Sequence, residues 1–257
     1  MDEGRADGSS VQVVRKSARI LDCFSAITPR LRAADIVHAT ALPASTVARI
    51  LRTLVGENLL QRQGQEYSIG LRVTVWSAAA KAGSDLIAAA GPHVTALRDS
   101  CRESCGVYVR QGASRVSVLG VESTHSIIYR GYIGQILPLQ AGAAGKVFMA
   151  YDEHALQAAL EDGLLAHTSH TVTDPQVLEK QLDQVREQGW AFAEQEREPG
   201  LNSLGAPIFG PGETIVAAIA VGAPSFRLTR AAAEDLADEV TACAAAISEA
   251  LLGQRRR

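Results

Sequence analysis

The sequence predicts an α+β protein in two parts, in which a small helical bundle closed by a β-hairpin precedes a larger mixed domain. Three observations support this prediction. Residues 11–56 contain three short helical patterns, residues 59–69 change to a two-residue period, and the rest of the chain mixes helix and strand patterns. A length of 257 residues is sufficient for two domains.

The N-terminal part contains three candidate helices. The first covers residues 11–24, in which apolar residues recur at helical spacing at Val14, Ala18, Leu21 and Phe24. After Thr28-Pro29 interrupts the pattern, a second helix fits residues 33–39. A third fits residues 43–56, with Pro43 in its first turn and Gly56 near its end.

The segment after these helices sets the expected domain boundaries. Residues 59–69 are typical of two short strands around a polar turn at Gln63-Gly64, and residues 71–81 are helical as far as Gly83-Ser84. We therefore expect a disordered polar tail at 1–10, a winged helix-turn-helix at 11–70, a linker helix at 71–84 and a second domain at 85–257.

The second domain alternates helix and strand patterns without an internal repeat. Helices are expected at residues 87–100, 146–151, 154–160, 176–188 and 228–252. Strands are expected at 106–109, 116–121, 206–209 and 214–221, the last two as a hairpin around Pro211-Gly212. Residues 127–130 and 135–139 are strand or loop. These patterns predict an antiparallel sheet with helices at its ends.

Charge is distributed unevenly along the chain. Residues 15–82 carry ten Lys/Arg and four Asp/Glu, whereas residues 83–257 carry fourteen and twenty-one. The basic first part favours a polyanionic partner for that part alone. The chain has no run of 18 apolar residues and starts with a polar stretch, so we expect no membrane span or signal peptide and a cytoplasmic location.

The third candidate helix has the two faces that a DNA-recognition helix requires. Apolar residues share one face at Val47, Ile50, Leu51 and Leu54. The opposite face carries Ser45, Arg49 and Arg52, with Thr46 beside it. Arginine can bind guanine through two hydrogen bonds, and Ser or Thr near a helix start can hold a phosphate. An ordinary amphipathic helix with solvated arginines is the alternative.

The predicted hairpin strengthens the DNA-binding interpretation. Its Arg62 and Gln65 could reach the DNA backbone or the minor groove. The predicted DNA-binding residues are therefore Ser45, Thr46, Arg49, Arg52, Arg62 and Gln65. The expected partner is double-stranded DNA.

Several motifs, in this order, resemble the IclR family of bacterial transcriptional regulators. The first domain matches at Val14, Ala18, Ile20, Leu21 and Phe24, along LPASTVARIL (42–51), at LVGENLL (54–60) and at YSIG (67–70). The second matches at PLQA (138–141), GKVFMA (145–150), GWA (189–191), Glu196 and Gly200, and API (206–208). The resemblance covers residues 11–252 and implies a GAF-like effector-binding domain.

The resemblance also implies partners. Similar proteins form homodimers joined mainly through their DNA-binding domains, often paired into tetramers, on a near-palindromic operator. They bind a small organic acid or aromatic compound in the C-terminal domain. Whether this chain is a repressor or an activator stays open.

The segment from Gly142 to Lys146 is a candidate for effector binding. It lies where a loop enters a helix, and free N–H groups at such a place suit a carboxylate. It is not a nucleotide-binding P-loop, since Gln140 stands in place of the first glycine and Val147 in place of Ser/Thr. Small residues for close helix packing are the alternative.

Departures from the family pattern indicate the class of effector. Members that bind small polar acids often have an acidic residue at the position of Ala193, cysteine at Ser203, and serines at Ala220 and Gly222. Fewer polar anchors favour an aromatic or otherwise hydrophobic acid over glyoxylate or pyruvate. Ser203 and the N–H groups of Ala143 and Ala144 would hold its carboxylate, with Leu137 and Leu139 lining the rest of the site.

Other functions are less well supported. We interpret Cys23, Cys101, Cys105 and Cys243 as reduced buried thiols, and His167 and His170 as loop residues, so no metal or cofactor is expected. The spacing around Ser203 is G-x-x-S-x-G instead of a nucleophile elbow, which disfavours a hydrolase. A metabolite-binding module that acts through protein partners is the other alternative. Salt-sensitive DNA binding would argue against it.

Overall fold

The computed structural model describes residues 11–254. It divides the chain into two compact units, residues 1–83 and 84–257. The polar tail expected at residues 1–10 lies outside the described residues. Over residues 11–254, no helix is both long and apolar enough to cross a membrane.

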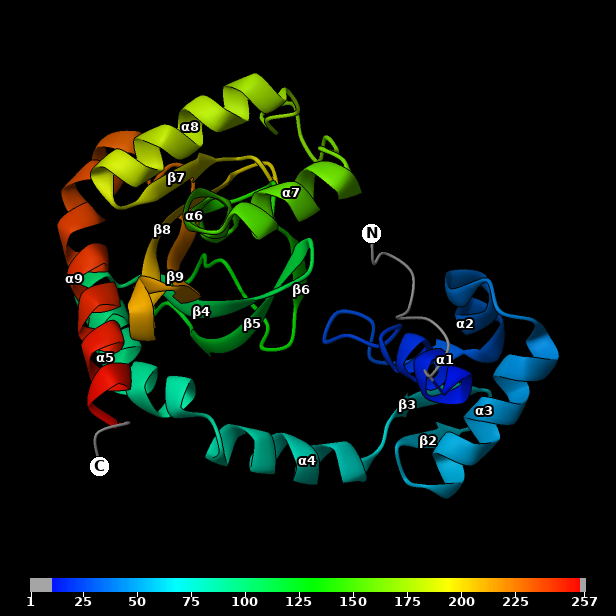
Figure 1. Cartoon of the computed structure of the whole chain (residues 1–257). Helices are drawn as coiled ribbons and strands as arrows, with labels where there is room; N and C mark the ends of the chain where they lie inside the picture. The colour runs from blue at the N-terminus through cyan, green and yellow to red at the C-terminus, as the bar shows by residue number, and fades with distance from the viewer. Residues whose placement is uncertain (1–10, 255–257) are drawn as a thin grey trace, which may run out of the picture. The chain divides into compact units, whose positions relative to one another are not determined.

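The N-terminal unit is a helical bundle with a small antiparallel sheet (Figure 1). Its elements are α1 (Gln12–Leu21), β1 (Leu31–Arg32), α2 (Ala33–Thr40), α3 (Ala44–Gly56), β2 (Leu60–Gln63), β3 (Glu66–Ile69) and α4 (Leu71–Ala82). The sheet order is β1-β3-β2. The three predicted helices, the hairpin and the helix after it are confirmed, while β1 was not predicted.

Helix α3 is held by the apolar face that the sequence predicts. Val47, Ile50, Leu51 and Leu54 are all buried, and they join a cluster with Ile20, Ile36, Leu42 and Leu60. Burial of each such side chain contributes about 1.5–3 kcal/mol. This cluster fixes which face of α3 remains exposed.

The apolar stripe expected on the first helix is confirmed for Leu21 and Phe24, which pack against the core, and is wrong for its first half. Val14 is 65 % exposed and Ala18 is also exposed, whereas Ile20 is fully buried. The helix ends at Leu21, and its last turn packs on the bundle, where the Arg19 side chain donates to the carbonyl of Thr40. Only the C-terminal end of the helix therefore contributes to the core. Helical spacing alone does not distinguish this end from the rest of the apolar stripe.

Two turn positions also differ from expectation. Pro43 precedes the first residue of α3 as its N-cap instead of lying inside the first turn. The β2–β3 turn lies at Gly64 and Gln65, with Gly64 at φ +62°. Glycine adopts this left-handed backbone conformation without steric cost.

The C-terminal unit is a six-stranded antiparallel sheet with helices on both faces (Figure 1). Its elements are α5 (Asp85–Cys101), β4 (Ser104–Gln111), β5 (Ser114–Val121), β6 (Ile136–Pro138), α6 (Ala143–Tyr151), α7 (Glu153–Asp162), α8 (Pro175–Gln188), β7 (Ala191–Glu194), β8 (Leu201–Phe209), η1 (Pro211–Glu213), β9 (Ile215–Pro224) and α9 (Arg230–Gln254). The strand order is β6-β5-β4-β9-β8-β7. Strand β7 was not predicted, and residues 127–130 form neither helix nor strand.

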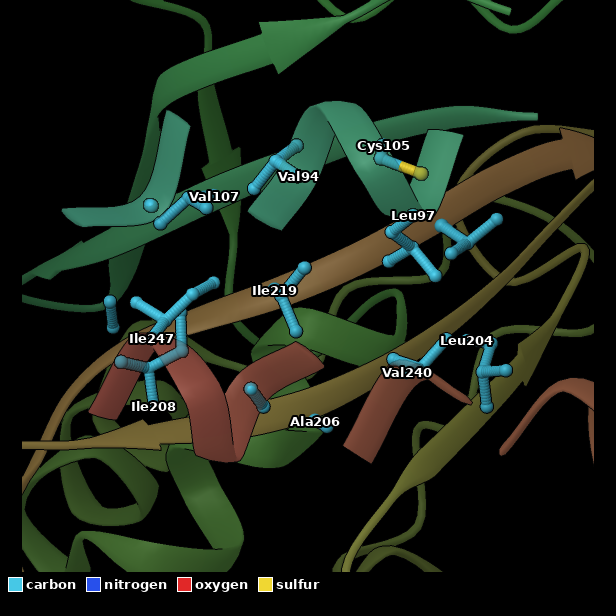
Figure 2. Close-up of a cluster of buried hydrophobic side chains, with 14 of the residues drawn as sticks. Val94, Leu97, Cys105, Val107, Leu204, Ala206, Ile208, Ile219, Val240 and Ile247 are labelled. Carbon is cyan, nitrogen blue, oxygen red and sulfur yellow. The ribbon is translucent and has the colours of Figure 1, made fainter. Parts of the chain in front are cut away.

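The expectation of helices only at the ends of the sheet is wrong. Helices α5 and α9 pack against one face, where Val94, Leu97, Val240 and Ile247 meet Ile219 and other strand side chains (Figure 2). Helix α6 packs against the other face, with α7 and α8 beside it. Successive strand residues point to opposite faces. A strand buried on both sides lacks the polar alternation that would reveal its covering helices.

Small residues allow the start of α6 to lie close to the sheet. A Cβ on Gly205 of β8 would lie 3.3 Å from the backbone nitrogen of Ala144, and one on Gly145 would lie 1.8 Å from the Leu139 carbonyl oxygen. The close-packing interpretation of the segment from Gly142 to Lys146 is therefore supported.

Candidate functional site

The exposed face of α3 carries the polar residues that the sequence singled out. Ser45, Arg49 and Arg52 are exposed, and Thr46 is half-buried. Arg49 and Arg52 make no side-chain hydrogen bond or ion pair with any other residue in the range 11–254. Both guanidinium groups thus keep all their donors available for an anionic partner.

The β2–β3 hairpin presents a further arginine. The Arg62 Nε donates to the carbonyl of Gly64 at 2.9 Å, and the guanidinium carbon lies 5.7 Å from the centroid of the Tyr67 ring. These contacts fix Arg62 on the hairpin, while the side chains of Arg62 and Gln65 remain exposed. The hairpin therefore offers donors suited to a phosphate backbone.

Large apolar side chains are exposed on α1 and on α4. On α1 they are Val13 and Val14, and on α4 they are Leu71, Val75 and Trp76. Arg72 lies against the Trp76 ring at 6.0 Å and pairs with Glu57 at 2.7 Å. Exposed apolar residues gathered on one short helix are typical of a surface that contacts another protein.

A cavity lies between α6 and the face of the sheet that it covers. Three residues line up across neighbouring strands beneath it, since Ala193 of β7 pairs with Ser203 of β8, which pairs with Gly222 of β9. The cavity is lined by Tyr108, Arg115, Tyr129, Leu137, Gly142, Ala143, Ala144, Ala193, Glu196, Arg197, Leu201, Ser203, Ala220, Val221 and Gly222. The space left for the centre of a water molecule is about 30 Å³, so the cavity is narrow in this state.

Most of the residues predicted to bind an effector line this cavity. They are Leu137, Ala143, Ala144, Ala193, Ser203, Ala220 and Gly222. Leu139 does not line it, because its side chain is fully buried in the apolar cluster beneath α6. Register across β7, β8 and β9 brings together residues that lie up to 29 positions apart in the sequence.

Two of the three expected carboxylate anchors, Ala143 and Ser203, are already hydrogen-bonded to each other. The N–H of Ala143 donates to Ser203 Oγ at 3.1 Å, and the N–H of Gly142 donates to Glu196 Oε2 at 3.2 Å. Glu196 also pairs with Lys146, and both side chains are almost completely buried. The helix start is therefore neutralised from within the protein, which corrects the expectation that the Ala143 N–H is free.

Arg115 was missed by sequence reasoning and lies in the wall of the cavity. It is 4 % exposed, and its two terminal nitrogens donate to the carbonyls of Pro138 and Ala141. Burial, and next the charge of Arg197, lower the pKa of Arg115 to about 10. The only available sequence signal was period-two alternation in β5, which places Arg115 and Ser117 on the same face.

Two tyrosines were also missed. The Tyr129 ring lies on Gly222, where an added Cβ would approach the ring to 2.7 Å, and the Arg197 guanidinium lies 5.0 Å from the ring centroid. Burial raises the pKa of Tyr108 to about 12, so this phenol remains protonated near neutral pH. Gly222 thus accommodates an aromatic ring of the protein itself.

The cysteines and the histidine pair lie away from the cavity. The sulfur atoms of Cys101 and Cys105 lie 3.7 Å apart. Of the four cysteines, Cys105 is buried and the other three are half-buried, so the expectation of buried thiols is correct for Cys105 alone. Their hydrogen bond lowers the pKa of Cys101 and raises that of Cys105. His167 and His170 lie in an irregular stretch, as expected. Residues 11–254 contain no group of three or more His, Cys, Asp or Glu side chains that could hold a metal ion.

These features define a class of protein in which a winged helix-turn-helix is combined with a separate ligand-binding domain. The chain belongs to the IclR family. The family's helix-turn-helix domain matches residues 13–64, and the C-terminal domain of bacterial transcriptional regulator IclR matches residues 78–249. It is therefore a transcriptional regulator with a DNA-binding domain and a C-terminal ligand-binding domain, and it is not an enzyme.

Individual relatives agree with this assignment. The chain is 30 % identical over 233 residues to the HTH-type transcriptional repressor AllR of Escherichia coli K12, covering 86 % of each chain. It is 29 % identical over 248 residues to the uncharacterised HTH-type regulator RhmR of the same strain, covering 95 % of each.

Solved structures show the same fold. An IclR regulator from Alicyclobacillus acidocaldarius superposes with a TM-score of 0.84 at 22 % identity, covering 94 % of this chain and 99 % of that one. An IclR homologue from Microbacterium hydrocarbonoxydans, solved with 4-hydroxybenzoate, has a TM-score of 0.78 at 21 % identity and covers 93 % and 98 %.

Proposed function

We propose that this protein binds an operator through Ser45, Thr46, Arg49, Arg52, Arg62 and Gln65, and that a small organic acid bound in the C-terminal domain alters this binding. The observation that carries the DNA part is the exposed, unpaired state of Arg49 and Arg52 on the outer face of α3. In a winged helix-turn-helix this face enters the major groove, and the hairpin contacts the adjacent backbone.

The proposed effector is an aromatic or otherwise hydrophobic acid. Ala193, Ala220 and Gly222 add no polar side chain to the cavity floor beside Ser203, and Tyr108 and Leu137 add apolar surface. A structural neighbour of the same fold binds 4-hydroxybenzoate, which supports this class without identifying the ligand here. A small polar acid such as glyoxylate would find few polar side chains on this floor to bind it.

The proposed assembly is a homodimer on a near-palindromic operator, able to pair into a tetramer in the cytoplasm. The exposed Val75 and Trp76 of α4 supply apolar surface for a second copy. Two copies related by a twofold axis read two half-sites about one helical turn of DNA apart.

The first experiment identifies the operator. Immobilised protein is incubated with fragmented genomic DNA from the source organism, and the retained fragments are sequenced. We expect enrichment of a sequence with approximate twofold symmetry. Uniform retention of all fragments would contradict sequence-specific binding and would favour a module that acts through protein partners.

The second experiment tests the effector class. Calorimetry with benzoate, 4-hydroxybenzoate and glyoxylate is combined with fluorescence anisotropy on the selected operator. We expect the aromatic acids to bind and to change operator affinity. Tight glyoxylate binding without binding of either aromatic acid would reject the proposed class.

A further inference from the structure

We propose that Arg115 is the carboxylate anchor of the effector site, through its Nε–H and the neighbouring terminal N–H. This inference rests on the proposed function, in which an organic acid occupies the cavity. Among residues 11–254, the buried Arg115 Nε has no hydrogen-bond partner. The residue is 4 % exposed and lines the cavity. A buried donor without an acceptor costs about 1–3 kcal/mol, and a ligand oxygen would remove that cost.

The surrounding backbone fixes the guanidinium and leaves one edge free. Its two terminal nitrogens donate to the carbonyls of Pro138 and Ala141, which orients the plane of the group. Gly142 and Gly145 make room for it, because a Cβ on either residue would lie 2.8 Å from an Arg115 nitrogen. A guanidinium can present its Nε–H together with one terminal N–H to the two oxygens of a single carboxylate.

Charge in the cavity favours an anion. The Glu196 carboxylate is already neutralised by Lys146, and Arg197 pairs with the exposed Glu198 at 3.2 Å. Within the part of the chain that the structure describes, Arg115 forms no ion pair, and its lowered pKa of about 10 reflects the cost of holding this charge away from water. A bound carboxylate would offset that cost, whereas a neutral amide of the same shape would not.

The remainder of the site indicates the shape of the ligand. The Arg115 guanidinium carbon lies 5.8 Å from the Tyr108 ring centroid, and Ala193, Ala220 and the Tyr129 ring complete the apolar surroundings. The cavity in this state has room for only about one or two waters, so a ligand ring must displace the Tyr129 ring from Gly222. Tyr129 lies in the irregular stretch 122–135, which can accommodate such a shift more easily than a strand.

The test is calorimetry of the full chain with benzoate and with benzamide, its neutral isostere. The variants are Arg115→Gln and Arg115→Lys, and the control is Arg186→Gln, an exposed arginine of α8 that pairs with Asp183 at 2.6 Å. We expect wild type and the control to prefer benzoate. Arg115→Gln should weaken benzoate binding by about 10- to 150-fold and remove the preference over benzamide. Arg115→Lys should retain part of the benzoate affinity and part of the preference over benzamide, because lysine keeps the positive charge.

The outcomes separate this inference from the proposed function. Unchanged benzoate binding by Arg115→Gln, or equal binding of benzoate and benzamide by wild type, overturns the role of Arg115 while leaving an aromatic effector in place. Failure of wild type to bind any aromatic acid overturns both. Thermal unfolding followed by circular dichroism checks that the variants fold. The comparison of benzoate with benzamide on the wild type tests the inference without any variant.

Discussion

Arg49 and Arg115 carry the same side chain in opposite environments. Arg49 is solvated on the outer face of α3, whereas Arg115 is enclosed between β5, β6 and the start of α6. A solvated guanidinium can bind and release a polyanion at little desolvation cost, while a buried one holds a single small anion. Helical spacing in the sequence identified Arg49 as a candidate. Arg115 could be identified as a candidate only from the structure, in which the pairing of β5 with β6 places it in the cavity wall.

At the residue scale, Arg49→Ala should weaken operator binding by about 1–3 kcal/mol and relax the preference at the contacted base pair. Anisotropy titrations on the operator and on single-base variants measure both effects. Arg130→Ala, in the C-terminal unit, is the matched control and should leave operator affinity unchanged. Wild-type affinity and base preference in Arg49→Ala would mean that another face of α3 contacts the DNA.

At the element scale, the approach of α6 to the sheet depends on glycine. Gly145→Ala should destabilise the C-terminal unit by about 1–3 kcal/mol, because its Cβ would lie 1.8 Å from the Leu139 carbonyl oxygen. Gly91→Ala in α5 is the matched control, since nothing lies within 4 Å of its added Cβ. That change should stabilise the helix by about 0.5–1 kcal/mol. Urea unfolding of both variants compares them, and equal stability would contradict the close packing.

Helix α4 presents a second prediction at this scale. Trp76→Asp should convert dimers to monomers at micromolar concentration, because it places a charge on the exposed apolar surface of α4. Sedimentation velocity measures the change. Ser77→Asp introduces the same charge about 200° around the helix from Val75 and serves as the control. Dimers that persist in Trp76→Asp but not in Ser77→Asp would move the interface to the other side of α4.

At the scale of the whole molecule, the two units should respond differently to salt. Operator affinity should fall steeply with salt, with a log–log slope of about −5 if a dimer contacts roughly six phosphates. Arg62→Ala should make this slope shallower by about two, one for each copy. Aromatic acid binding in the enclosed cavity should change much less over the same salt range. Salt-independent retention of DNA would contradict binding through the basic unit.

The direction of regulation also belongs to the whole molecule. If the acid lowers operator affinity by some factor, linkage requires that the operator lowers acid affinity by the same factor. Calorimetry of the acid with and without saturating operator measures this coupling. Equal acid affinities under both conditions would show that the ligand does not act on DNA binding.

The sequence by itself determined the two-part architecture, the three helices with their hairpin, the exposed arginines of α3 and seven of the fifteen residues that line the cavity. Helical spacing, turn chemistry and short motifs are local properties, so a single chain displays them directly. Ser203 and Gly222 were placed in the effector site through family motifs, not through periodicity.

Only the tertiary structure decided what completes the cavity. The partners of Ala143 and Glu196, the unpaired Nε of Arg115 and the ring of Tyr129 on Gly222 all depend on contacts between distant strands and loops. It also decided that Val14 is exposed and that helices cover both faces of the sheet. The physical reason is that burial and charge compensation arise from packing, which spacing along the chain does not encode.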